Sequence, residues 1–93
     1  MTPDSRPALP RFVKLRFDRA RDTWLLLAPE RILIPDEIAV EVLKLCDGEA
    51  TLSAIAAILA ARYDAPEAQI LTDVTAMLGD LEAKGFLCDR EAA

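Results

Sequence analysis

Hydrophobic and polar residues alternate near the start of the chain. Val13, Leu15 and Phe17 fall on one face of an extended segment and basic residues fall on the other, which is typical of a strand with one solvated side. Two short apolar runs follow, separated by Pro29 and Glu30. A polar segment of hairpin length lies between the first two of these three segments. The pattern predicts three strands, at about residues 12–18, 23–28 and 31–34.

The spacing of apolar residues becomes helical after Pro35, which suits the first turn of a helix. Gly48 and Gly85 are typical of positions where helices end, and Thr51 is typical of a position where one begins. The pattern predicts helices at about residues 36–47, 52–63 and 67–84. The third carries a broad apolar stripe of roughly 120°, made of Ile70, Leu71, Val74, Met77, Leu78 and Leu81.

The order of these elements, strands first and helices after, predicts the fold class. It favours an α+β domain in which a three-stranded antiparallel sheet is followed by a three-helix bundle, similar to a winged helix. Residues 1–10 contain Pro3, Pro7 and Pro10, which cannot donate to a strand ladder. We therefore expect residues 1–10 to form a flexible N-terminal arm and residues 11–93 to form a single domain.

The composition argues against catalysis. The 93 residues include no histidine, so the commonest general base and metal ligand are missing. The two cysteines, Cys46 and Cys88, lie in apolar segments and are interpreted as structural thiols. No metal-binding or nucleotide-binding motif is present. We therefore predict no catalytic residue, no metal and no cofactor.

The charges are unevenly distributed along the chain. Residues 1–35 hold seven Lys or Arg and four Asp or Glu, whereas residues 36–93 hold four and twelve, so an N-terminal part of net charge +3 precedes a C-terminal part of net charge −8.

The longest apolar run has five residues, far fewer than the roughly 18 needed to cross a membrane. The N-terminus has no apolar signal core. These features predict a cytoplasmic protein with no membrane partner.

The third predicted strand has the features of a peptide-binding edge. It is short and apolar, and Pro29 and Pro35 flank it. At the edge of a sheet, its backbone N–H and C=O groups would be unpaired on one side. Such an edge can accept a partner's strand, and the apolar stripe of the third helix could line the same groove. The alternative, in which Ile32, Ile34, Leu78 and Leu81 form only core, stays open.

Two other binding functions also stay open. The sheet and helices fit a winged-helix DNA-binding regulator, but residues 67–84 hold four acidic residues and one lysine, which would repel phosphates. We therefore do not expect a nucleic-acid partner. An exposed strand edge also fits a dimerisation module, so a homodimer is the second alternative.

Four segments together resemble the pyrroloquinoline quinone (PQQ) biosynthesis protein D family. They are RFVKLRF at residues 11–17, LLAPE at 26–30, LKLCDG at 43–48 and LEAKGFL at 81–87, and the resemblance covers nearly all of residues 10–88. It implies a non-catalytic chaperone of a ribosomally made precursor peptide, with three strands and three helices. It also implies that the peptide's leader adds to the third strand and packs on the third helix. The complex would then serve a radical S-adenosylmethionine (SAM) enzyme that crosslinks a Glu and a Tyr of the peptide.

The resemblance also implies which residues bind the peptide. Its backbone would run along Arg31, Ile32, Leu33 and Ile34, and its apolar side chains would contact Val74, Met77, Leu78 and Leu81, with Leu71 and Thr75 at the margin. Pro29 would set the bend between strands and Gly48 would end the first helix. A basic rim of Arg16, Arg19 and Arg21 would contact the enzyme partner or an acidic segment of the peptide, or would simply be solvated.

Overall fold

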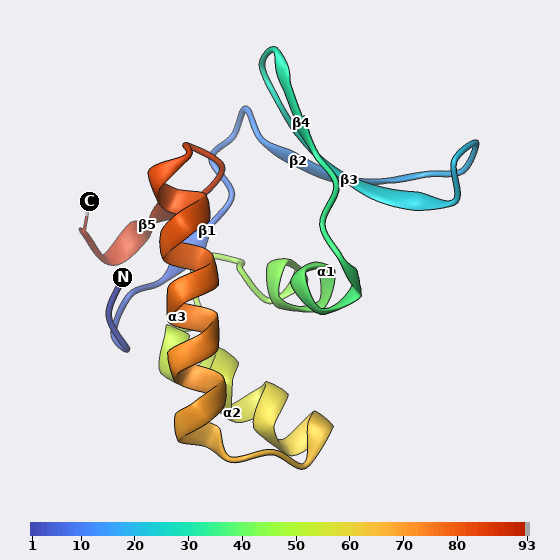
Figure 1. The fold of residues 1–93 in the computed structure, drawn as a ribbon. Coiled ribbons are helices and arrows are strands. Elements are labelled where there is room, and N and C mark those ends of the chain that lie inside the picture. The colour runs from blue at the N-terminus through green and yellow to red at the C-terminus, as the bar shows by residue number, and fades with distance from the viewer. Residues whose placement is uncertain (93) are drawn as a thin grey trace.

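The computed structural model of the protein describes residues 1–92, which form three helices and two small sheets (Figure 1). One antiparallel sheet has the order β2-β3-β4, and a two-stranded sheet pairs β1 with β5. The predicted α+β fold class, with a three-stranded sheet followed by three helices, is confirmed; the likeness to a winged helix stays a prediction. The elements are β1 (Pro7–Ala8), β2 (Lys14–Asp18), β3 (Thr23–Ala28), β4 (Arg31–Leu33), α1 (Glu37–Lys44), α2 (Leu52–Tyr63), α3 (Glu67–Ala83), β5 (Cys88–Asp89) and a 3-10 turn at Arg90–Ala92.

Local sequence signals explain where the helices begin and end. The side chains of Asp36 and Thr51 cap α1 and α2 by accepting hydrogen bonds from the backbone N–H groups of the third residue along. At the end of α3, Gly85 has a φ of +85°, and the next amide, Phe86 N–H, donates to the carbonyl of Leu81 at 2.9 Å. This left-handed cap reverses the chain and returns Phe86 to the core, where it is buried.

The core lies between the three helices and the inner face of β3. Leu26 of β3 is fully buried with residues from each helix, among them Val42, Ile55 and Leu78. Leu25 and Leu26, neighbours at the middle of β3 whose side chains lie on opposite faces of the strand, are both buried. Within residues 1–92, no helix has the length and apolar character needed to cross a membrane.

The N-terminal segment differs from the flexible arm expected from its prolines. Pro7–Ala8 pairs with Cys88–Asp89 as β1 and β5, and Ser5, Pro7 and Ala8 are buried. The physical reason is that proline lacks an N–H but keeps its carbonyl. The carbonyl of Pro7 accepts from Gly48 N–H at 3.0 Å, and that of Pro3 accepts from Ser53 N–H at 3.0 Å. The segment is therefore tied to both the α1–α2 loop and the chain's C-terminal end.

Three details near the predicted boundaries also differ. The first predicted strand begins two residues late, at Lys14, because the N–H of Val13 donates to the carbonyl of Pro10 and closes a turn.

The first helix ends at Lys44 and is capped by Leu45, so Gly48 does not end it. Gly48 instead has a φ of +80°, and an added Cβ would lie 2.6 Å from the Arg90 side chain. Pro35 lies just before the Asp36 cap rather than inside the helix.

Candidate functional site

Strand β4 is an edge strand that offers backbone groups to a partner. It pairs with β3 on one side only, with the register Leu26↔Leu33, Leu27↔Ile32 and Ala28↔Arg31. Pro29 and Glu30 form the two-residue turn, and Glu30 has a φ of +62°. In such a hairpin the pair next to the turn is hydrogen-bonded and the next pair is not. The N–H and C=O of Ile32 therefore point outward, away from β3.

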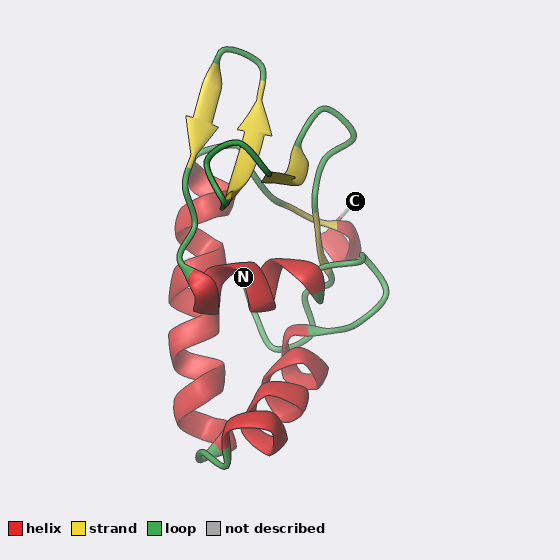
Figure 2. Ribbon diagram, turned by 90° about the vertical axis from the view of Figure 1, so that its right-hand side faces the viewer, coloured by secondary structure: helices red, strands yellow, loops and turns green. Residues whose placement is uncertain are grey.

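A groove of about 250 Å³ runs between β4, α1 and the C-terminal half of α3. Figure 2 shows the strands, in yellow, beyond the C-terminal end of α3. Apolar side chains form most of the groove, and three charged residues stand in its walls. The lining residues are Leu33, Ile34, Pro35, Asp36, Ala39, Leu43, Met77, Asp80, Leu81 and Lys84. An extended, mostly apolar peptide segment fits these walls.

The groove contains part of the predicted peptide-binding set. Leu33 and Ile34 come from the β4 side and Met77 and Leu81 from α3. Ile34 is 64% exposed and thus presents apolar surface to solvent. Ile32 is 62% exposed, but its side chain points to the face opposite that of Leu33, because side chains alternate along a strand. Ile32 thus contributes its backbone to the edge rather than a side chain to the groove.

The other predicted α3 residues lie elsewhere. Leu78 is fully buried and belongs to the core, as does Val74, which is 4% exposed. Leu71 and Thr75 are half-buried on the other side of the helix. At 100° per residue, Thr75 lies about 160° and Leu71 about 120° around α3 from Met77. The structure therefore does not bring Leu71 and Thr75 into the groove with β4.

Several groove residues were missed by sequence reasoning. Asp80 and Lys84 flank Met77 on the same side of α3, and their side chains form an ion pair at 2.9 Å. Asp80 is three residues and Lys84 is seven residues from Met77, and these helical spacings could have indicated this polar border. The contribution of α1, through Ala39 and Leu43, has no comparable signal in the sequence. It depends on how α1 crosses α3 in space.

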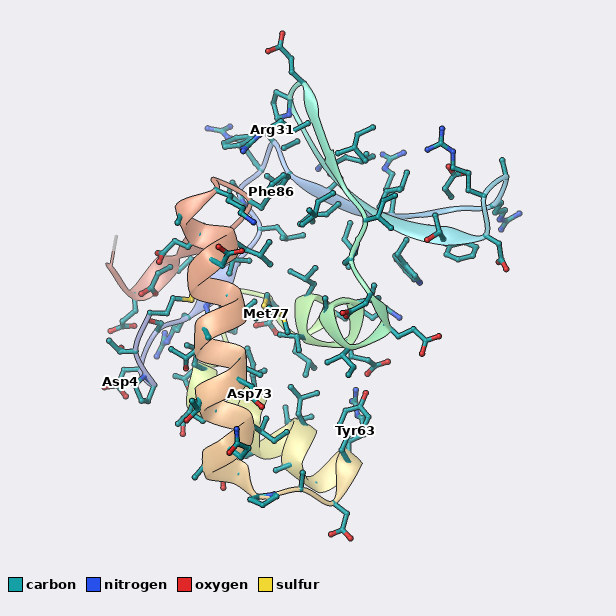
Figure 3. All side chains as sticks on the ribbon, in the orientation of Figure 1. Asp4, Arg31, Tyr63, Asp73, Met77 and Phe86 are labelled. Atoms are coloured by element: carbon teal, nitrogen blue, oxygen red, sulfur yellow. The ribbon has the colours of Figure 1, made fainter. Side chains whose placement is uncertain are left out.

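Arg31 holds the start of β4 against the end of α3 (Figure 3). Its guanidinium carbon lies 4.5 Å from the centre of the Phe86 ring, a cation–π contact. The neighbouring Gly85 leaves room for this contact, since a Cβ there would lie 3.0 Å from a guanidinium nitrogen of Arg31. The edge strand is thereby connected to the helix that forms the opposite wall of the groove.

The basic rim lies on the β2–β3 hairpin, which projects from the body of the molecule (Figure 1). Arg21 pairs with Asp18 at 3.7 Å, and both Arg16 and Arg19 are exposed. In the part of the chain that the structure describes, neither Arg16 nor Arg19 has a carboxylate within ion-pair distance. The rim is therefore a cationic surface, separate from the groove.

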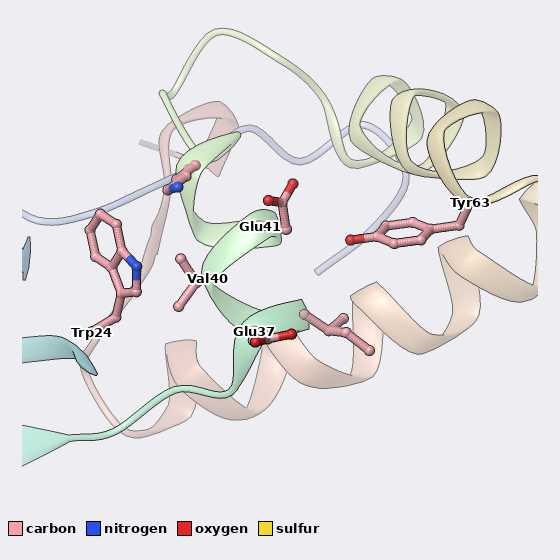
Figure 4. Close-up of a pocket in the computed structure, with 7 residues that line it drawn as sticks. Trp24, Glu37, Val40, Glu41 and Tyr63 are labelled. Carbon is pink, nitrogen blue, oxygen red and sulfur yellow. The ribbon is translucent and has the colours of Figure 1, made fainter. Parts of the chain in front are cut away.

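A third surface lies on the far side of α1. A hollow of about 310 Å³ is bordered by Trp24, Glu37, Val40, Glu41 and Tyr63, among others (Figure 4). The Lys44 ammonium sits 4.6 Å from the centre of the Trp24 ring. This hollow is larger than the groove and has the same number of charged side chains in its walls, but it borders no edge strand. It does not fit strand addition.

Two neighbouring side chains on the segment after α1, Cys46 and Asp47, have shifted pKa values. Burial, together with the smaller effect of the neighbouring Asp47 charge, raises the pKa of the Cys46 thiol to about 12, so the thiol is protonated at neutral pH. Backbone N–H groups of Ala50 and Glu49 donate to Asp47 and lower the pKa of its carboxyl. Over residues 1–92, no three His, Cys, Asp or Glu side chains gather as metal ligands would.

Comparison with known proteins decides the family. The family model of Coenzyme PQQ synthesis protein D (PqqD) matches residues 23–87, which include β3, β4 and all three helices. The chain belongs to the PqqD family. A PqqA binding protein of Rhodopseudomonas palustris strain BisB5 is 61% identical over 90 residues, covering 96% of this chain and 88% of the relative. One from Xanthomonas axonopodis pv. citri is 49% identical, with 94% and 95% covered.

Two solved PqqD structures share the fold. One is the solution NMR structure of the PqqD truncation of Methylobacterium extorquens PqqCD, described as a functional and stand-alone recognition element for ribosomally synthesized and post-translationally modified peptides. It has a TM-score of 0.75 and 51% identity, with 88% of this chain and 87% of that chain covered. The crystal structure of PqqD from Xanthomonas campestris has a TM-score of 0.57 and 46% identity, covering 90% and 93%.

Proposed function

We propose that this chain is a non-catalytic peptide chaperone that binds PqqA, the precursor peptide of PQQ biosynthesis, by strand addition to β4. The observation that carries this proposal is the outward edge of β4 beside an apolar groove. The names of the relatives support the choice of peptide, since they are PqqA binding proteins and a peptide recognition element. Main-chain hydrogen bonds would hold the peptide and the groove would select its apolar side chains.

The bound peptide then has a defined position. Its backbone faces the N–H and C=O groups of Ile32, and its groove-side residues face Leu33, Ile34, Met77 and Leu81. The edge is short, with three paired residues, and Pro35 follows it closely. Short edges flanked by proline resist indiscriminate pairing with other chains. The same feature that limits aggregation would thus limit binding to a peptide that also fits the groove.

A radical SAM enzyme is the proposed recipient of the peptide complex. Binding at β4 and α3 leaves the β2–β3 hairpin accessible, and its unpaired arginines Arg16 and Arg19 fit an acidic surface on that enzyme or on the peptide's free segment. An edge-to-edge homodimer would use the same β4 groups as the peptide. Light scattering with and without peptide would reveal this competition as dissociation of the dimer.

The proposal is tested by titrating the isotope-labelled protein with synthetic PqqA and following its backbone amides by NMR. We expect the amide signals of Ile32, Ile34 and Met77 to shift, while those at the start of α2, around Ser53, stay in place. Unchanged signals along β4 and α3 at saturating peptide would rule out strand addition at this edge. A shift confined to the β2–β3 hairpin would place the peptide on the basic rim instead.

A further inference from the structure

Two exposed apolar side chains lie beyond the β4 groove and do not serve the core. Ile38 on the first turn of α1 is 61% exposed, and Tyr63 at the end of α2 is 49% exposed. Both residues border a hollow of about 190 Å³ between α1, α2 and α3, whose other lining residues are Val42, Leu59, Ile70, Asp73, Val74 and Met77.

This hollow is apolar except at one point. Among the described residues that line it, Asp73 alone is charged, and its exposed carboxylate accepts a hydrogen bond from the Gln69 side chain at 3.1 Å. Figure 3 shows three of the lining residues: Asp73 and Met77 on α3, and Tyr63 on α2. An apolar cavity of about 150 Å³ is enough to hold a benzene ring. The hollow therefore accommodates one leucine or aromatic side chain.

The hollow adjoins the β4 groove at Met77. Met77 lines both, and Ile38 and Ala39 of α1 stand in the hollow and the groove respectively. From Lys84 at one end to Ile70 at the other, α3 rises about 21 Å, which an extended peptide spans in six or seven residues. The three paired residues of β4 cover only the first part of this path.

We propose that the peptide bound at β4 continues past Met77 and inserts one bulky apolar side chain into the hollow between α1, α2 and α3. A cationic residue of the peptide beside that anchor faces Asp73. The inference rests on the proposed function, because it takes the strand-added peptide as the occupant. The position of the hollow next to the groove, with Met77 in the lining of both, and the negative charge of Asp73 at its mouth favour this occupant over a second copy of the chain, whose net charge is −5.

The test follows side-chain methyl signals of the full chain during titration with synthetic PqqA. We expect the methyl groups of Ile38, Ile70, Val74 and Met77 to shift together with the β4 amides. Ile58 is the internal control, because it is an exposed isoleucine on α2 that lines neither the hollow nor the groove. Shifted β4 amides with unchanged methyls in the hollow would overturn this inference and leave strand addition standing.

Matched substitutions measure the contribution of the anchor. Ile38→Asp puts a charge at the mouth of the hollow, and the fold tolerates it because acids are favoured in the first turn of a helix. We expect PqqA to bind about tenfold more weakly to this variant, whereas Ile58→Asp should bind within about twofold of the parent chain. Equal affinities for the two variants would contradict the anchor. Shifts of the same methyls on concentrating the protein without peptide would assign the hollow to a second copy and also overturn it.

The charge at the mouth has its own control pair. Asp73→Lys should weaken PqqA binding about threefold at low salt and less at high salt, because exposed charges are screened. Glu82 is an exposed acid on α3 that lies about 180° around the helix from Asp73. Glu82→Lys makes the same change in net charge and should leave the affinity unchanged. If Asp73→Lys and Glu82→Lys change the affinity for PqqA equally, no cationic residue of the peptide faces Asp73.

Discussion

Replacing Ile32 by proline separates the backbone of β4 from its side chain. The N–H of Ile32 points away from β3, so Ile32→Pro removes a donor that the domain's own ladder does not use. Proline is tolerated at such positions on edge strands, and it favours an extended conformation in the preceding residue, Arg31, which β4 already requires. Ile32→Ala is the matched control, since it shortens the same side chain and keeps the N–H.

The expected magnitude follows from one hydrogen bond. A net contribution of about 1 kcal/mol per backbone hydrogen bond corresponds to about fivefold in affinity. The proline ring also stands where the peptide's carbonyl would approach, so fivefold is the lower bound. The Ile32 side chain is 62% exposed and lies on the face away from the groove, so we expect Ile32→Ala to change the affinity by less than about twofold.

Calorimetric titration of each variant with synthetic PqqA measures the difference. Thermal unfolding and the amide signal of Leu33, which pairs with Leu26 in the ladder, check that the hairpin is intact in the proline variant. If Ile32→Pro and Ile32→Ala bind PqqA equally well while both stay folded, the peptide does not use the outward N–H of Ile32. Strand addition at β4 would then be refuted.

The remaining predictions concern the core, a buried thiol and the basic rim. Leu78→Ala should lower the free energy of unfolding, measured in urea, by about 2–5 kcal/mol, because Leu78 is fully buried. Met77→Ala should lower the free energy of unfolding less than Leu78→Ala does, but it should weaken PqqA binding more. Because burial raises the pKa of Cys46 from 9.0 to about 12, the native state keeps a proton that the unfolded state loses. Stability should therefore fall as pH rises from about 9 toward 12, and Cys46→Ala should remove that contribution in pH-dependent urea unfolding. The double substitution Arg16→Glu and Arg19→Glu should slow association with an acidic partner, measured by stopped flow. If the association rate of the parent chain does not change with salt, the basic rim does not attract the partner.

Much of the fold could be predicted because its signals are local. The apolar run that becomes β3 and the Thr51 cap of α2 were placed correctly, since both depend on residues close in sequence. The short β1–β5 sheet was not predicted, because it joins residues about 80 positions apart and each strand has two residues. Proline-rich sequence also hid the fact that Pro3 and Pro7 accept hydrogen bonds through their carbonyls.

The candidate site was predicted only in part for a similar reason. A broad apolar stripe on α3 shows that the helix is buried on one side, but it does not show which edge of the stripe borders a groove. Leu78 and Thr75 fall on or near the stripe, yet one lies in the core and the other faces away from β4. The spacing of Asp80 and Lys84 puts them on the same side of α3 as Met77, but only the placement of α1 and β4 beside α3 shows that this side borders a groove.

Periodicity, proline and composition act locally, so the sequence alone predicts the order of the three main strands and three helices, the short proline-bounded strand and the lack of histidine. The tertiary structure decided that β4 has one free edge and that Ile38 faces outward. It also places Met77 in the lining of both the β4 groove and the hollow between the helices. These features depend on how α1 crosses the other two helices, and helix crossing is set by the packing of distant side chains rather than by any one segment.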